Sequence, residues 1–294
     1  MGTVIERVVL TEGGWLTRRS ALRLAVKSAK DCLERAGRDP DDVELLVNAG
    51  IYRDRNLGEP AMAAMIQQDI DANPEDPHAG GHGTFSFDIS NGTCGVLTAL
   101  QIVDGFLKSR AVDCALVVAG DADPGHGMSD DFPFSPAGAA LLCDWTDSDD
   151  GLERIHWVSV PDDGETFNAT VGLIDHHNVL RFAAADDKDE RFAAAAAGAV
   201  ESCLRGSALT LDEVDAIVAA PAHSAFRAAL AGRLGIPAAR VTVADDAGLH
   251  TASLAAAFER AAGGVRQHGL ILLVAAAAGI TAGAGLYRLP ASQV

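Results

Sequence analysis

Two spacings of apolar residues alternate along the chain, one typical of helices and one typical of buried strands. Residues 20–36 carry apolar side chains at helical spacing, and Gly37 follows them as a stop signal. Residues 43–51 (VELLVNAGI) form a continuous apolar run, which is typical of a strand covered on both faces. The rest of the first half predicts helices over 59–70 and 93–109 and strands over 85–89, 114–121 and 138–145.

The second half repeats this order of elements. It predicts helices over 190–204, 225–235 and 250–262 and strands over 214–220, 241–243, 270–278 and 282–289. The segment PDDVELLVNA (40–49) also resembles LDEVDAIVAA (211–220), at an offset of 171 residues. Strands that alternate with helices indicate an α/β fold with largely parallel, mixed sheets. We therefore expect a duplicated fold with a pseudo-twofold axis, whose halves span residues 1–150 and 151–294.

Charge narrows the range of partners. The 294 residues include 23 basic and 41 acidic side chains, a formal net charge of −18. An acidic surface repels phosphate backbones, so we expect no nucleic-acid partner. The same charge repels an acidic acyl carrier protein, whereas a coenzyme A thioester is easier to accommodate.

Cysteine usage and the start of the chain indicate a cytoplasmic protein. The five cysteines are scattered singly, which favours free thiols over disulfides. The opening MGTVIERVVL lacks the long apolar run of a signal peptide. The most apolar stretch, residues 270–279, is too short to cross a bilayer, so we expect no membrane partner.

Neither a metal nor a nucleotide cofactor is expected. His176 and His177 are adjacent, so on an extended segment they point to opposite faces, and neither they nor His78 and His82 have a carboxylate or thiol at ligand spacing. No Gly-rich phosphate motif follows the first predicted strand.

Two loops at equivalent places in the halves are the candidates for chemistry. Residues 87–95 (FDISNGTCG) and 243–253 (VADDAGLHTAS) each lead into a helix. A pseudo-twofold axis directs both helix N-termini toward a common centre. The positive end of the helix dipole lowers the pKa of a thiol at that position, which favours the thiolate form. A histidine opposite can act as a base, and Asp245 or Asp246 could orient its imidazole.

Five segments in sequence order resemble the ketoacyl-ACP synthase III group of condensing enzymes, which have the thiolase fold. They are FDISNGTCGVLTAL, VDCALVVAGD, PFSPAGAALL, VDAIVAAPAHSAFRAALAGRLGIP and GITAGAGLYRL. The resemblance covers nearly the whole chain and implies a five-layer αβαβα architecture. It also implies acyl transfer or condensation on an acyl-CoA or acyl-ACP thioester, in fatty acid or polyketide biosynthesis. The family's dimer, built on the strand equivalent to residues 85–89, implies a dimer here.

The resemblance assigns site residues but departs from the family at the nucleophile. Ungapped alignment places the family's cysteine on Thr93, one residue before Cys94. Either Cys94 carries the acyl group from a shifted helix start, or it is a core thiol beside a capping Thr93. His223 matches the family histidine. His250 matches its second catalytic group, although Gly248 or Leu249 could hold that place. Backbone amides around Gly279 and at the helix start would form the oxyanion hole.

Two functions therefore remain open. Cys94, His223 and His250 converge in one pocket and transfer acyl groups, or the chain is a non-catalytic subunit that pairs with an active thiolase-fold homologue. Compared with the family, the chain is short before its first helix, where a strand is usual, and residues 164–189 are compact. Both features predict an altered or reduced substrate tunnel.

Overall fold

Most of the strands form two mixed sheets, one from each part of the chain. The computed structural model describes residues 2–14, 19–74, 83–174 and 176–291. The first sheet has the order β1-β5-β4-β2-β3, in which β2, β3 and β4 are parallel and β5 is antiparallel to β1 and β4. Its strands are β1 (Gly2–Glu12), β2 (Leu45–Asn48), β3 (Phe85–Asp88), β4 (Cys114–Asp121) and β5 (Ala137–Thr146).

The second sheet has the order β11-β10-β12-β13-β6, and β7 pairs with β13. Strands β10, β11 and β12 are parallel, whereas β13 is antiparallel to β12, as in the first sheet. Its strands are β6 (Gly151–Leu152), β7 (His156–Ser159), β10 (Ala216–Ala220), β11 (Val241–Thr242), β12 (Leu270–Ala277) and β13 (Thr281–Arg288).

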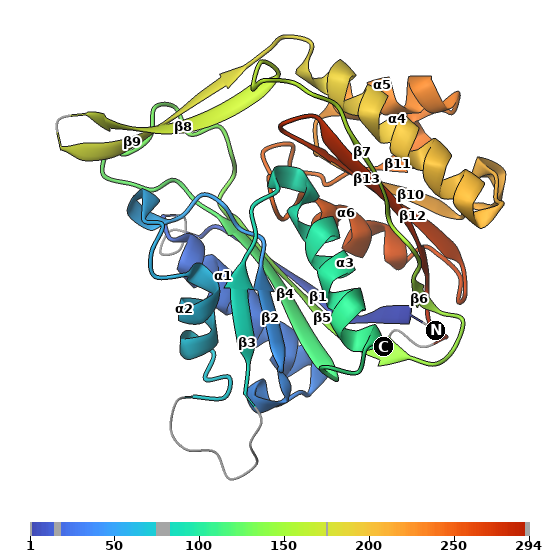
Figure 1. The fold of residues 1–294 in the computed structure, drawn as a ribbon, viewed down its shortest axis with the longest axis horizontal. Helices are drawn as coiled ribbons and strands as arrows, with labels where there is room; N and C mark the ends of the chain where they lie inside the picture. The colour runs from blue at the N-terminus through green and yellow to red at the C-terminus, as the bar shows by residue number, and fades with distance from the viewer. Residues whose placement is uncertain (1, 15–18, 75–82, 175, 292–294) are drawn as a thin grey trace.

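Helices cover both outer faces of this pair of sheets and fill the space between them (Figure 1). Helices α1 (Ala21–Ala36) and α2 (Met62–Asp69) cover the first sheet, and α4 (Lys188–Ser207) and α5 (Ser224–Leu234) cover the second. Helices α3 (Gly95–Lys108) and α6 (Ser253–Ala262) lie in the middle. The predicted five-layer α/β architecture is confirmed.

Local sequence explains where these helices begin and end. The Ser20 side chain accepts a hydrogen bond from the Arg23 N–H and caps α1, and Gly37 ends the helix with a left-handed φ of 67°. The middle helix α3 buries Val96, Leu100 and Val103 in a core that residues of both sheets share. A helix that is apolar on most sides suits a place between two sheets, because water reaches little of its surface.

The prediction about the start of the chain is wrong. Residues Gly2–Glu12 form β1, which pairs antiparallel with β5, so a strand does precede the first helix. The sequence pattern does not reveal this strand, because its buried positions do not alternate strictly and a bulge shifts the register between Ile5 and Arg7.

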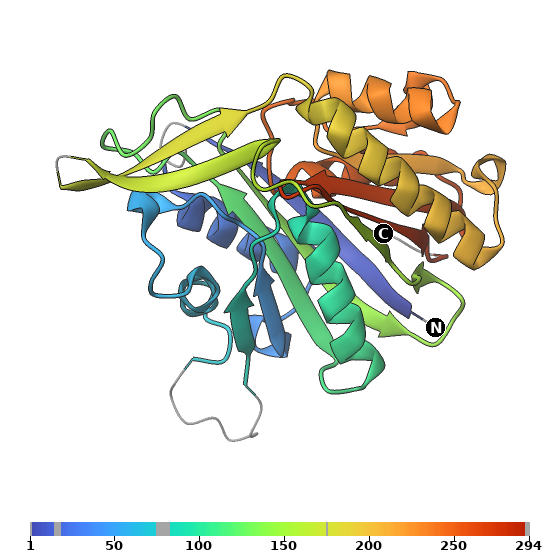
Figure 2. The ribbon, with the colours of Figure 1, turned by 45° about the horizontal axis from the view of Figure 1, so that its top comes forward.

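Residues 164–189 are not compact either. They contain an antiparallel hairpin of β8 (Phe167–Ile174) and β9 (His177–Ala184) that projects from the body (Figures 1 and 2). In the middle of β9, the Leu180 N–H donates to the carbonyl of Met128 over 2.9 Å. The hairpin contributes one wall of the cavity described below.

Candidate active site

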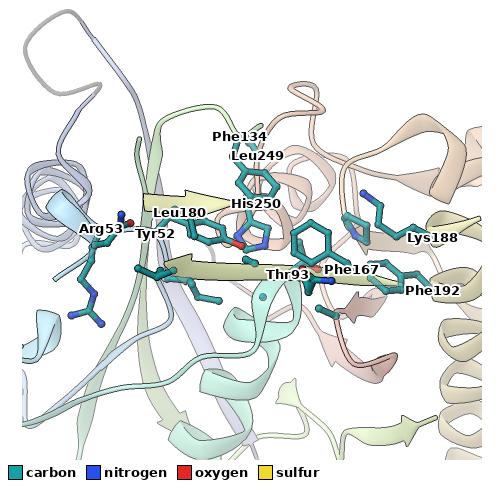
Figure 3. A pocket seen from close by; sticks show the side chains of 18 of the residues that line it. Tyr52, Arg53, Thr93, Phe134, Phe167, Leu180, Lys188, Phe192, Leu249 and His250 are labelled. Atoms are coloured by element: carbon teal, nitrogen blue, oxygen red, sulfur yellow. The ribbon is translucent and has the colours of Figure 1, made fainter. Parts of the chain in front are cut away.

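A cavity of about 540 Å³ lies where the two sheets, α4 and the hairpin meet (Figure 3). Both parts of the chain line it: Tyr52 and Thr93 come from the first, and His223 and His250 from the second. Most of the remaining lining is aliphatic or aromatic, including Phe134, Phe167 and Phe192. This volume and composition are those of a small-molecule site.

Thr93 lines the cavity, whereas Cys94 does not. Both belong to the short 3₁₀ turn Gly92–Cys94 that leads into α3. The Thr93 hydroxyl donates a hydrogen bond to the carbonyl of Ala276 on β12. The Cys94 thiol is fully buried in the core between the sheets and lies 3.4 Å from the carbonyl of Thr281, to which it donates. Burial raises the pKa of this thiol.

The predicted convergence of Cys94 with the two histidines is therefore wrong. Successive residues of a 3₁₀ turn differ in direction by about 120°, so only one of Thr93 and Cys94 can face the cavity. The family alignment placed Thr93 there, and the structure does the same.

His250 is held by a buried carboxylate. Its Nδ1 lies 3.3 Å from Oδ2 of Asp121, the last residue of β4. The imidazole is 8% exposed and Asp121 only 2%. The second ring nitrogen of His250, Nε2, faces the turn that carries Thr93. It lies 3.8 Å from the position that a Cβ atom on Gly92 would occupy. The imidazole is thus oriented with one nitrogen on Asp121 and the other toward the cavity.

Both carboxylate oxygens of Asp121 accept hydrogen bonds from several donors. Oδ2 accepts from the Thr251 N–H (2.9 Å) and hydroxyl (2.6 Å), and Oδ1 accepts from the Ile51 and Tyr52 N–H groups (3.1 and 2.9 Å). Burial favours the protonated form of Asp121, but the bonds from His250, Thr251 and Tyr52 outweigh it and hold the pKa of the carboxyl below its usual range. An ionised Asp121 fixes the tautomer of His250 with hydrogen on Nδ1.

His223 forms a second pair with a carboxylate. It precedes α5, and its Nδ1 lies 3.0 Å from Oδ1 of Asp189 in the first turn of α4. Burial alone would raise the pKa of Asp189, but the hydrogen bond with His223 and the charges of His223 and Lys188 together lower it below its ordinary value. Both histidines line the cavity, so the structure places two histidine–carboxylate pairs at one site.

The carboxylates of both pairs escaped the sequence analysis. We expected Asp245 or Asp246 to orient His250, and this is wrong. Asp245 pairs with Arg260, and Asp246 accepts from the Gly248 N–H. One signal was available for Asp121, since an acidic residue that ends a fully buried strand needs a partner.

Gly279 lies in the turn between β12 and β13, with a φ of 72° that favours glycine. Its neighbour Ala278 lines the cavity.

No group of three His, Cys, Asp or Glu side chains suited to a metal ion occurs among the described residues, which exclude His78 and His82. In the same part of the chain, no helix combines the length and apolarity that a membrane span requires.

Curated proteins named beta-ketoacyl-[acyl-carrier-protein] synthase III resemble the chain over almost its full length. The protein of Ehrlichia ruminantium (strain Welgevonden) is 24% identical and that of Anaplasma marginale 25% identical, over 96% and 97% of this chain and 92% and 93% of those proteins. No protein-family model matches the chain.

Solved structures agree on the fold. The 3-oxoacyl-[acyl-carrier-protein] synthase III of Aquifex aeolicus superposes with a TM-score of 0.79 at 20% identity, covering 98% of this chain and 100% of that one. OleA of Xanthomonas campestris superposes with a TM-score of 0.80 at 14% identity, covering 98% of each chain. Together, these comparisons show that the chain has the thiolase fold and is similar over almost its full length to proteins named beta-ketoacyl-ACP synthase III.

Proposed function

We propose that the protein binds an acyl thioester in the cavity and transfers the acyl group directly to an acceptor, without an acyl-cysteine intermediate. The single observation that carries the proposal is the His250–Asp121 pair, whose imidazole faces the cavity beside Thr93. Among the residues that the structure describes, no thiol lines this cavity. The available base therefore acts on the acceptor rather than on a protein nucleophile.

The proposed reaction needs only the base and the two substrates. Nε2 of His250 takes the proton of an acceptor hydroxyl or amine while the acceptor attacks the thioester carbonyl. The carbon–sulfur bond then breaks, and the imidazolium returns the proton to the leaving thiolate. Asp121 stabilises the imidazolium charge between these steps. The products are the acylated acceptor and a free thiol.

The oxyanion that forms in this reaction needs hydrogen-bond donors. The turn Gly92–Cys94 presents the N-terminal end of α3 to the cavity through Gly92 and Thr93, and the partial positive charge of such an end favours an anion. We propose that backbone amides of this turn stabilise the oxyanion together with amides near Gly279. The His223–Asp189 pair would assist at the acceptor side of the cavity.

Thr93 is not the nucleophile in this proposal. Its hydroxyl proton is donated to the carbonyl of Ala276, and a carbonyl oxygen does not take up a proton as a base does. A threonine hydroxyl is a weak nucleophile unless an adjacent base removes its proton.

Coenzyme A is the proposed carrier of the acyl group. The chain has a net charge of −18, which disfavours docking of an acidic carrier protein. Two cationic side chains, Arg53 and Lys188, line the cavity (Figure 3). Arg53 already pairs with Asp88 at 3.3 Å, so Lys188 is the cation that we propose for the phosphates of a coenzyme. We place this chemistry in the cytoplasm.

The second candidate is a non-catalytic subunit that binds an acyl ligand and pairs with an active homologue. The observation that favours it is the loss of a usable nucleophile, because Cys94 is buried and Thr93 is bonded to a carbonyl. This candidate requires binding without turnover.

Two measurements on one panel of variants separate the candidates. Calorimetry measures acyl-CoA binding, and chromatography measures release of free coenzyme A with water as acceptor. Direct transfer predicts release by the wild type and a loss of about 10²-fold or more in His250→Gln, with binding retained. His268→Gln is the control, because His268 also pairs with a carboxylate, Asp150, at 2.8 Å, but does not line the cavity. Binding without release by the wild type would support the second candidate instead.

A further inference from the structure

Aromatic side chains concentrate at this cavity. Aromatic residues make up only 5% of the chain, with ten phenylalanines and two tyrosines. Half of the phenylalanines and one tyrosine line the cavity or contact its lining, namely Tyr52, Phe132, Phe134, Phe167, Phe182 and Phe192. Elsewhere the described core consists mostly of Ala, Val, Leu and Ile, with a few aromatic residues such as Phe226, Phe258 and Tyr287. The aromatic lining is thus a local feature.

The rings form one connected cluster on the His250 side. Tyr52 stacks on Phe134 with centroids 5.1 Å apart, and Phe134 lies 4.3 Å from the imidazole of His250. Phe132 and Phe182 meet Tyr52 edge to face at 5.7 and 5.3 Å. These contacts fix the ring planes, so the cavity wall is rigid there.

Two further rings stand on the side of α4. Phe167, on β8, has the Lys188 ammonium 5.6 Å from its centroid, and Phe192, on α4, is 5% exposed. Figure 3 shows Phe167 between His250 and Lys188, so rings border the cavity on either side of the imidazole.

Four of the six rings are incompletely buried. Phe132, Phe134, Phe167 and Phe182 are all partly exposed, whereas the core residues Phe226 and Phe258 are 0% and 3% exposed. Partly exposed phenyl groups around one cavity are the expected state of a site that a ligand completes.

We propose that the acyl group of the substrate carries an aromatic ring, which packs against Phe134 and Phe167 next to His250. This inference rests on the acyl-thioester binding proposed above and narrows its substrate class to aryl or arylalkyl acyl groups. Aromatic rings attract one another in offset-stacked or edge-to-face geometry beyond the effect of area alone. An aliphatic chain would pack against leucine, valine or isoleucine as well as against the four rings that line the cavity, which are Tyr52, Phe134, Phe167 and Phe192.

The test compares two acyl-CoA probes of the same shape. Phenylacetyl-CoA and cyclohexylacetyl-CoA have six-membered rings at the same position, and the cyclohexyl ring is the more hydrophobic. Calorimetry should find phenylacetyl-CoA bound about two- to tenfold more tightly by the wild type. Phe167→Leu should reduce that preference at least twofold, whereas Phe106→Leu, at a ring that does not line the cavity, should preserve it.

Each other outcome is decisive. Equal binding of both probes, or tighter binding of cyclohexylacetyl-CoA, would overturn the aromatic preference and leave acyl-thioester binding standing. If neither probe nor a straight-chain acyl-CoA binds, the proposed function itself fails, and the inference fails with it.

Discussion

Thr93 and Cys94 are adjacent in sequence but face opposite sides of the turn that begins α3. The Thr93 hydroxyl lies at the cavity and donates to Ala276, whereas the Cys94 thiol is sealed in the core and donates to Thr281. In the proposed function, this arrangement excludes a cysteine-dependent condensing mechanism and leaves the His250–Asp121 pair as the base at the cavity.

Thr93→Cys should restore a reactive thiol. The new Sγ would replace a side chain that lines the cavity at the N-terminal end of α3, where the helix dipole lowers a thiol pKa. We expect one added site of iodoacetamide labelling and an acyl adduct after incubation with an acyl-CoA. Thr93→Ser is the matched control and should form no adduct. An unlabelled Thr93→Cys protein would show that position 93 is not accessible from the cavity.

The five native thiols should resist labelling while the protein is folded. All of them are buried, and burial raises the pKa of Cys94 above its ordinary value. Mass spectrometry should find no carbamidomethyl groups on native protein and five after unfolding. Cys94→Ala should lower the free energy of unfolding by about 1 kcal/mol and change coenzyme A release less than twofold. Rapid labelling of Cys94 in folded protein would contradict its assignment to the core.

Asp121→Asn should impair both activity and stability. An amide cannot hold the His250 tautomer or stabilise the imidazolium, so coenzyme A release should fall about 10²-fold or more. At pH 7 the variant should be less stable by about 3 kcal/mol, because it breaks a buried pair. Asp150→Asn, at the His268–Asp150 pair outside the cavity, should leave release unchanged.

The stability difference between wild type and Asp121→Asn should also depend on pH. Folding lowers the pKa of Asp121 below the unfolded value of about 3.9. The stabilising contribution is therefore present above about pH 4 and is lost as the pH falls through the folded pKa. Denaturant titrations at pH 7, 5 and 3 should show the difference shrink only below pH 4. A constant difference across that range would contradict a lowered pKa of Asp121 in the folded protein.

We expect the protein to dimerise through β3. This strand is at the end of the first sheet, and Phe85 on it is 58% exposed beside Phe87 and Phe106. An apolar sheet edge of this kind invites pairing with another chain, whether a second copy or a homologue. Light scattering at micromolar concentration should find a dimer for the wild type and a monomer for Phe85→Glu with an unchanged circular dichroism spectrum. A monomeric wild type would refute this.

The periodic elements were predictable because one face or both faces of each are buried. The helix over 20–36 and the strand over 114–121 coincide with α1 and β4 to within a residue. Strand β1 was missed because its pattern is broken by a bulge, and the hairpin because β8 is exposed along most of its length. Exposed strands carry little apolar periodicity, so sequence alone does not reveal them.

The sequence predicted site residues only at positions that match a motif of the resembled family. Thr93, His223 and His250 were found through the family resemblance and do line one cavity. Asp121 and Asp189 belong to other elements, and their distances to the histidines depend on tertiary structure. The direction of the Cys94 side chain was also undecided, since a one-residue shift of a helix start is invisible in the sequence.

One acid-quenched sample tests the central claim most directly. The protein is mixed with phenylacetyl-CoA, or with whichever acyl-CoA binds most tightly, and stopped during turnover. Free coenzyme A and the mass of the intact protein are then measured in the same sample. Direct transfer predicts several equivalents of coenzyme A per protein molecule and an unmodified protein mass. An added acyl mass located on Cys94, or no released coenzyme A at all, would contradict it.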